Sequence, residues 1–304
     1  MPRLALILTT LIWGATFPAT KAALAQIPPF SFLFLRFLLG AILAVGVYLA
    51  VGGRLRFDRD LLRMSGIATV FLFIGYVTQT VGLRYTTASN SAFITVLYVI
   101  FVPIFLRRFQ GRTWFSAALA MTGLWFLVHP SLEMNVGDLW TLACAVAFAA
   151  HIACMEAYSR RGEAALFFLW QMIFVTVLLG PTVPLEGPTW EQVAPTGILL
   201  VGLGVTGGLA TGAFAVQVWA QRVLPAQQVA LIFSLEPAFA AWLSWYFLGE
   251  QLSTQGWLGS SLILAAVIIG GLAQAEALPD SEVRHSSLGI RKSESTKSVP
   301  TNNG

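Results

Sequence analysis

Residues 30–51 read FSFLFLRFLLGAILAVGVYLAV, a run of 22 residues that contains a single charged side chain, Arg36. A helix rises about 1.5 Å per residue, so this run extends about 33 Å and can cross a hydrocarbon core about 30 Å thick. Comparable apolar runs recur along the 304-residue chain, in which 57% of the residues are hydrophobic and 11% are charged. Soluble domains carry about 25% charged residues. The sequence therefore predicts an all-α integral membrane protein.

Charged residues, glycines and prolines separate the apolar runs from one another. Their positions predict ten transmembrane helices, at residues 4–24, 30–51, 62–83, 87–109, 114–128, 137–158, 164–183, 194–220, 225–248 and 254–273. From about residue 276 the chain is polar and rich in serine, lysine and asparagine, which predicts a disordered tail at 276–304.

The basic residues fall on one side of the predicted membrane. With a cytoplasmic N-terminus, 15 of the 18 Lys and Arg residues lie in cytoplasmic segments, Lys21 and Arg84 lie outside, and Arg36 lies within a span. Cytoplasmic loops carry such an excess of positive charge. We therefore expect a multi-pass protein of a bacterial-type inner (plasma) membrane with both termini in the cytoplasm. The net charge of +4 is interpreted as a topology signal, with no nucleic-acid partner.

The sequence contains an internal repeat. Shifted by 138 residues, segment 66–111 aligns with 204–249 without a gap and matches at ten positions, among them Gln79 with Gln217. Biased composition alone would give roughly four matches. Five helices per unit is an odd number, so the second unit must insert upside down relative to the first. This predicts two inverted five-helix repeats, at residues 1–130 and 131–275, followed by the cytoplasmic tail, and transporters use such repeats to build a central site.

Several short motifs carry a family resemblance. The first predicted span reads WGATF at 13–17, the second contains RF at 36–37, and the fourth begins YTTASNSAF at 85–93. The ninth contains LEPAF at 235–239 and ends LGE at 248–250. Together these motifs resemble the EamA-type transporters of the drug/metabolite transporter (DMT) superfamily over about residues 4–273.

The resemblance implies ten helices in two inverted halves and the export of small metabolites. One branch of the family, the YddG-type exporters, moves aromatic and other amino acids, and it suggests the substrate class to test first. The first half departs from the family pattern because Tyr98-Val99 stands where the second half has Glu236-Pro237.

Four polar or ionisable side chains lie at similar depths in their predicted helices: Thr16, Tyr98, His151 and Glu236. An acid at the bilayer midplane is costly unless it faces protein, water or a partner, so Glu236 is a candidate for proton coupling or for binding a substrate amine. The alternative is a protonated carboxyl that is hydrogen-bonded to a neighbouring helix. His151 has the same two interpretations, as a substrate-binding residue or as a neutral ring bonded to a neighbouring helix.

The repeat adds further cavity candidates. Gln79 and Gln217 are equivalent and can both donate and accept hydrogen bonds, which suits a polar substrate, although glutamines also join helices. Tyr76 and Phe214 lie on the same helix faces by three-residue spacing and are equivalent to each other. Trp170 is a candidate wall residue. These five complete the nine predicted substrate-binding residues.

An enzyme is disfavoured because the three histidines are dispersed and no nucleotide-binding loop or cluster of metal ligands is evident. We expect no cofactor and no metal. Arg36 is the one arginine inside a predicted span and is expected to snorkel outward or to bind a carboxylate. With few fixed charges, a neutral or zwitterionic substrate fits best, so we predict amino-acid export by alternating access. The alternatives are export of drugs or other metabolites, by proton-coupled antiport or facilitated diffusion, and a channel. The expected partners are the small-molecule substrate and the lipid bilayer, with a monomer as the functional unit.

Overall fold

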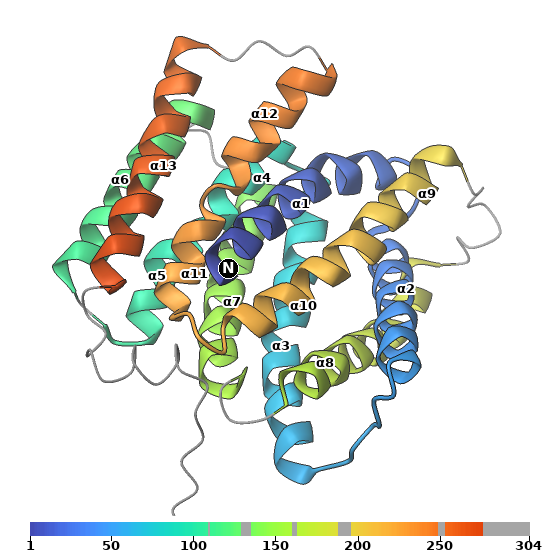
Figure 1. Ribbon diagram of the computed structural model, residues 1–304. Coiled ribbons are helices and arrows are strands. Elements are labelled where there is room, and N and C mark those ends of the chain that lie inside the picture. Colours follow the sequence, from blue (N-terminus) through green and yellow to red (C-terminus); the bar gives the residue numbers. More distant parts are fainter. Residues whose placement is uncertain (109, 129–134, 160–162, 188–195, 249–252, 276–304) are drawn as a thin grey trace, which may run out of the picture.

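The computed structural model describes residues 1–108, 110–128, 135–159, 163–187, 196–248 and 253–275, and these residues form helices and connecting turns without β-strands. The predicted tail at 276–304 lies outside the described residues. Figure 1 shows the arrangement of the elements. In the first part of the chain these are α1 (Pro2–Ala23), α2 (Pro29–Ala50), α3 (Arg59–Gly82), α4 (Ala88–Thr95), α5 (Tyr98–Phe105) and α6 (Gly111–Val128). In the second part they are α7 (Val136–Ser159), α8 (Ala164–Leu179), the 3₁₀ helix η1 (Gly180–Glu186), α9 (Gly197–Leu203), the π-helix η3 (Gly204–Leu209), α10 (Ala210–Ala220), α11 (Ala226–Phe233), α12 (Glu236–Leu248) and α13 (Thr254–Ala275).

Six of the described helical segments are long and apolar enough to cross a membrane: Pro2–Ala23, Pro29–Ala50, Arg59–Gly82, Val136–Ser159, Ala164–Glu186 and Gly197–Ala220. The other four predicted spans are helical as well. Two of them are the continuous helices α6 and α13, which pack against each other at one edge of the molecule (Figure 1). The remaining two are interrupted. The prediction of an all-helical membrane protein is therefore confirmed.

The two interrupted spans break at equivalent places. The α4–α5 break falls at residues 96–97 and the α11–α12 break at 234–235, which are 138 residues apart. At both breaks amides bond three residues back, as Leu97 N does to Ile94 O (3.1 Å) and Leu235 N to Ile232 O (3.1 Å). Pro237 lacks an amide proton, which favours the second break. Val99 occupies the equivalent place in the first, so proline is not required for the interruption.

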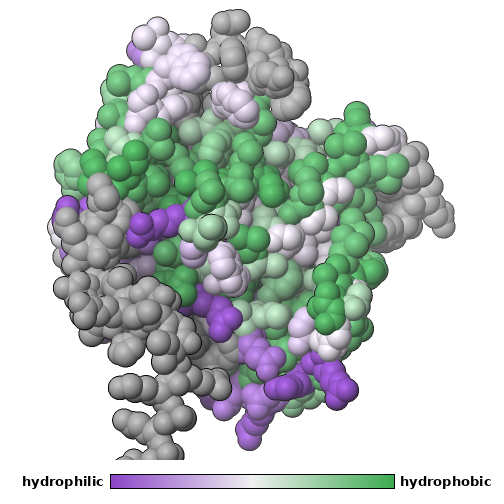
Figure 2. All heavy atoms as spheres, viewed as in Figure 1, coloured by the Kyte–Doolittle hydropathy of each residue, from purple (hydrophilic) through white to green (hydrophobic). Residues whose placement is uncertain are grey.

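The outer surface suits a lipid environment. Figure 2 shows helix faces that are largely hydrophobic, with hydrophilic residues gathered toward the lower edge, where α2 ends and α3 begins. Residues 54, 56 and 58–60 between and at the start of these helices are exposed and charged. Large apolar side chains such as Val47 (63% exposed) and Ile268 (54%) face outward along the helices. Exposed apolar surface of this extent indicates contact with lipid.

Charged side chains bond to the ends of neighbouring helices at two separate places. Lys21 donates from the end of α1 to the carbonyls of Leu83 and Thr86, at the α3–α4 junction. Glu156, near the end of α7, forms an ion pair with Arg108 (2.9 Å) and accepts a hydrogen bond from Ala226 N at the start of α11 (2.9 Å). A carboxylate at a helix N-terminus satisfies amides that have no partner inside the helix.

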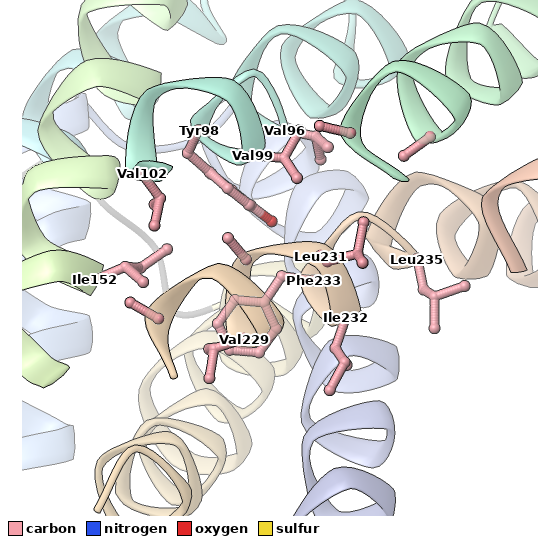
Figure 3. Close-up of a cluster of buried hydrophobic side chains, with 14 of the residues drawn as sticks. Val96, Tyr98, Val99, Val102, Ile152, Val229, Leu231, Ile232, Phe233 and Leu235 are labelled. Atoms are coloured by element: carbon pink, nitrogen blue, oxygen red, sulfur yellow. The ribbon is translucent and has the colours of Figure 1, made fainter. Parts of the chain in front are cut away.

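Two large apolar clusters and two smaller ones form the interior of the described part of the chain. One large cluster contains side chains of α5, α6, α7, α11 and α13, and Figure 3 shows part of it, including Val96, Val229 and Phe233. The other large cluster joins α2, α3, α8 and α10. Trp13 and Phe148 pack against both large clusters. An internal cavity lies beside these two residues.

Candidate functional site

One cavity lies between α1, α3, α7 and α10 and the two broken helices. It contains about 560 Å³ of space free of atoms, counting any part open to solvent. Eight of the nine candidate residues from the sequence line it: Thr16, Tyr76, Gln79, Tyr98, His151, Phe214, Gln217 and Glu236. These residues come from six segments that are distant in the chain.

Tyr98 and Glu236 stand at the two helix breaks. Tyr98 is the first residue of α5 and Glu236 the first of α12, and both are buried. Figure 3 shows the Tyr98 hydroxyl reaching toward the junction of α11 and α12. It lies within interaction range of the Glu236 carboxyl at the other break. The two residues therefore meet across the two broken helices, and both line the cavity.

His151 is held by the neighbouring helix α8. Its Nε2 lies 2.9 Å from Gln171 Oε1, while Gln171 Nε2 donates to Phe167 O (3.2 Å). The second bond orients the amide, so the oxygen faces the ring and the proton must sit on His151 Nε2. His151 is thus bonded to a neighbouring helix and also lines the cavity, which combines the two interpretations drawn from the sequence.

The two glutamines make different contacts. Gln79 donates to Thr95 Oγ1 (3.3 Å), whereas Gln217 donates to Gln221 Oε1 (2.9 Å), and Gln221 donates in turn to Ile152 O (3.0 Å). Gln79 therefore joins α3 to α4, whereas Gln217 bonds within the end of α10 and is linked to α7 through Gln221. Both glutamines also line the cavity.

On α1, one buried donor has no partner. Thr16 Oγ1 donates to Trp13 O in its own helix (2.7 Å). The indole Nε1 of Trp13 is buried and bonds to none of the described residues. Trp13 also lines the cavity, so its indole is a candidate donor to a bound substrate.

Aromatic rings form much of the wall. Tyr76 packs edge-on against Phe148 (ring centroids 5.2 Å apart), and Phe214 lies 5.5 Å from the His151 ring. Trp13 packs against Phe233 at 4.8 Å. Such rings bind the apolar part of a ligand through contact area and ring geometry.

Trp170, the ninth candidate, lies elsewhere in the fold. Its indole donates to Arg56 O (3.1 Å), and its ring packs against Phe57 (5.1 Å) and Phe174 (5.4 Å). These contacts place Trp170 against the segment between α2 and α3, away from the cavity lining.

Arg36 does not snorkel outward. Its side chain is 4% exposed, and its guanidinium lies over the rings of Tyr76 (4.6 Å) and Phe37 (5.2 Å). Its Nε has no hydrogen-bond partner, and no described carboxylate forms an ion pair with it. A positive charge thus stands directly behind one aromatic wall of the cavity.

The cavity also contains residues that the sequence reasoning did not select as site residues. These are Trp13, Phe17, Leu72, Thr95, Phe148, Ile152 and Phe233. Fourteen of the 15 lining residues form pairs separated by 135 or 138 positions, and Leu72 is the exception. The pairs are Trp13 with Phe148, Thr16 with His151, Phe17 with Ile152, Tyr76 with Phe214, Gln79 with Gln217, Thr95 with Phe233, and Tyr98 with Glu236. Most of the residues that were not selected lie close in sequence to a selected residue and form pairs at the repeat offset. Applying that offset to the neighbours of the selected residues could therefore have identified them.

The described part of the chain contains no group of three or more His, Cys, Asp or Glu residues that could bind a metal ion. The groups at the cavity are one carboxyl, one imidazole, two amides, hydroxyls and aromatic rings. This set can bind a small molecule through hydrogen bonds, charge and ring contacts.

Known proteins resemble the chain over most of its length. The model of the EamA-like transporter family matches residues 2–129 and again residues 135–271. A protein named "Uncharacterized transporter" from Archaeoglobus fulgidus is 36% identical over 275 residues, covering 88% of this chain and 85% of its own. "Uncharacterized inner membrane transporter YhbE" from Escherichia coli K12 is 25% identical, covering 87% and 89%.

A solved crystal structure shares the fold, with a TM-score of 0.76 and 17% identity, over 90% of this chain and 98% of its own. The matches to the family model together cover far more than half of the sequence, and the apolar helices are those of a membrane protein. The chain therefore belongs to the EamA-like transporter family, and it is a membrane transporter.

Proposed function

We propose that this protein exports small zwitterionic metabolites, amino acids including aromatic ones, by alternating access through the cavity beside Trp13 and Phe148. The observation that carries the proposal is the composition of that cavity, which combines a carboxyl, the unpartnered Trp13 indole, two amides and aromatic walls. A substrate with both a charged backbone and an apolar side chain would use all of these groups.

Each part of an amino acid has a counterpart in the lining. The Glu236 carboxyl suits an ammonium group, because opposite charges in a low-dielectric site attract strongly. The Trp13 indole, the Tyr98 hydroxyl and the glutamine amides are donors for a carboxylate. The rings of Tyr76 and Phe214 suit an aromatic or aliphatic side chain.

Arg36 strengthens the case for a zwitterion. Its guanidinium stands behind Tyr76 on α2, whereas Glu236 lies at the start of α12. A cavity with a positive charge behind one wall and an acid in its lining favours a dipolar substrate over a simple cation.

We also propose ten spans arranged as two inverted five-helix repeats, residues 1–130 and 131–275, with 276–304 as a tail. The two matches of the family model, the helix breaks 138 residues apart and the seven pairs around the cavity support this arrangement. Paired residues around one cavity are expected where a pseudo-two-fold axis passes through it. The distribution of Lys and Arg supports cytoplasmic termini, and the name of the E. coli relative supports an inner-membrane location.

Elements that could move surround the cavity. Two broken helices, the π-helix η3 and Pro18 within α1 interrupt regular helical bonding. Alternating access in transporters with inverted repeats is largely a rocking of helices around a fixed site. We therefore expect the cavity to open alternately to each side.

Counterflow in proteoliposomes tests the proposal. Vesicles are loaded with one unlabelled amino acid from a panel, and uptake of labelled Phe or Thr is followed without an imposed gradient. We expect loaded amino acids to stimulate uptake above empty vesicles, with the ranking of substrates read directly from the panel. Absence of stimulation by every amino acid, in vesicles that contain folded protein, would contradict amino-acid transport.

A further inference from the structure

A second cavity opens on the outer surface of the molecule, where α2, α8 and α10 meet (Figure 1). We call it the lateral groove. It contains about 1220 Å³ of space, counting its open side. It is lined by Leu43, Ala44, Val47, Tyr48 and Val51 of the α2 segment, Ala164, Ala165, Phe168 and Leu169 of α8, and Gly208, Thr211, Gly212, Ala215, Trp219 and Arg222 of the η3–α10 segment.

The lateral groove faces the lipid. Its rim includes large apolar side chains that point outward, such as Val47 (63% exposed) and Trp219 (46%). Its depth comes from missing side chains, because a Cβ placed on Gly208 or Gly212 meets no atom within 4 Å. An elongated apolar ligand can therefore enter the groove without displacing protein atoms.

One end of the lateral groove is positively charged. Arg222 follows the end of α10, at the same end of the bundle as Val51 of α2 and Ala164 of α8. Arg222 is exposed, and no described residue forms an ion pair with it. Arg54 follows at this end, where its carbonyl accepts a bond from the Tyr48 hydroxyl (3.5 Å). The groove lining contains no acidic residue.

We propose that the lateral groove is a binding site for an anionic glycerophospholipid. An acyl chain lies along the apolar lining above Gly208 and Gly212, and the phosphate binds Arg222. Basic residues at the mouth of a crevice between transmembrane helices recognise lipid phosphates through charge-assisted hydrogen bonds. The proposal is independent of which substrate the protein transports.

The groove lies close to the transport cavity. Phe168 of the groove packs edge-on against Phe214 of the cavity, with ring centroids 5.4 Å apart. A lipid in the groove therefore supports the contact between α8 and α10 from outside. Lipid binding to the folded state raises its stability by mass action.

Native mass spectrometry of the detergent-solubilised full chain tests the proposal, with phosphatidylglycerol and phosphatidylcholine of identical acyl chains as probes. We expect phosphatidylglycerol to bind about fivefold more tightly, as one interfacial arginine provides. Arg222→Gln should abolish that preference, while Gly212→Leu should weaken binding of both lipids. Arg84→Gln, an exposed arginine outside the groove, and Gly66→Leu, a substitution that also meets open space, are the matched controls. Thermal unfolding with each lipid provides a second readout.

Equal binding of the two lipids to the unsubstituted protein overturns the proposal. Equal lipid binding to Gly212→Leu and Gly66→Leu also overturns the proposal, provided that the unfolding temperatures show both variants to be folded. A third outcome also overturns the proposal: the protein forms a dimer that added lipid does not dissociate but that Gly212→Leu does. A second copy of the chain would then be the occupant of the groove.

Discussion

Tyr98 and Glu236 each begin the second segment of a broken helix, and both side chains line the same cavity. They are 138 residues apart, the offset that aligns the two halves of the sequence. The structure thus places a hydroxyl in one half where the other has a carboxyl. Irregular backbone inside a membrane is tolerated where it is buried in protein or lines a cavity, and both breaks meet this condition.

If Glu236 carries protons, replacing it by Gln should abolish the dependence of transport on a pH gradient while leaving substrate exchange. The amide keeps the size of the side chain and an oxygen that accepts a hydrogen bond from a substrate ammonium, but it carries no titratable proton. The measurement is uptake into proteoliposomes with and without an imposed pH gradient. Glu163→Gln is the control, because Glu163 lies in an exposed ion pair with Arg56 outside the cavity. Gradient dependence that persists in Glu236→Gln would remove Glu236 from proton coupling.

Replacing Gln217 or Gln79 by Ala should lower transport at subsaturating substrate about tenfold. Each change removes a hydrogen-bonding group from the cavity, and the loss of one hydrogen bond to the substrate costs about 1.4 kcal/mol of binding free energy. Counterflow of labelled substrate measures the loss. Gln255→Ala on the exposed face of α13 should leave transport unchanged. Full activity in both cavity variants would count against these amides as substrate ligands.

Tyr98→Phe should weaken substrate binding about three- to tenfold. The change removes the hydroxyl beside the Glu236 carboxyl, which is a donor for a substrate carboxylate in the proposed site. Substrate concentration dependence of counterflow gives the affinity, and thermal unfolding gives the stability. A variant with unchanged affinity would show that the hydroxyl does not contact the substrate.

Glu156→Ala should destabilise the protein by roughly 1–3 kcal/mol. The carboxylate is 8% exposed, pairs with Arg108 and accepts the amide proton of Ala226, which would lose that partner. Thermal unfolding in detergent measures the change. Glu163→Ala removes an exposed ion pair, with both partners more than half exposed, and should cost less than about 1 kcal/mol. Equal unfolding temperatures for the two variants would show that the contacts of Glu156 with Arg108 and Ala226 do not stabilise the fold.

Pattern reasoning predicted most of the cavity residues and failed in instructive places. Thr16 and His151 were found from their depth, and Gln79 and Gln217 from the repeat. Trp170 was chosen as a wall residue because it adjoins Gln171 in the inner part of its helix, and in the structure it packs against Arg56 and Phe57. The helix breaks were not predicted, because apolar residues continue through both of them.

The sequence by itself determined that the chain is a helical membrane protein of the EamA-like family, because hydrophobicity, charge distribution and short motifs are properties of segments. Only the tertiary structure decided which helix faces meet around the cavity, that Arg36 lies buried against Tyr76, and that Glu156 of α7 joins α11 to the segment after α5. The physical reason is the solvent. In a bilayer the faces toward lipid and the faces toward protein are both apolar, so hydrophobic patterning identifies a span but not the direction in which its side chains point.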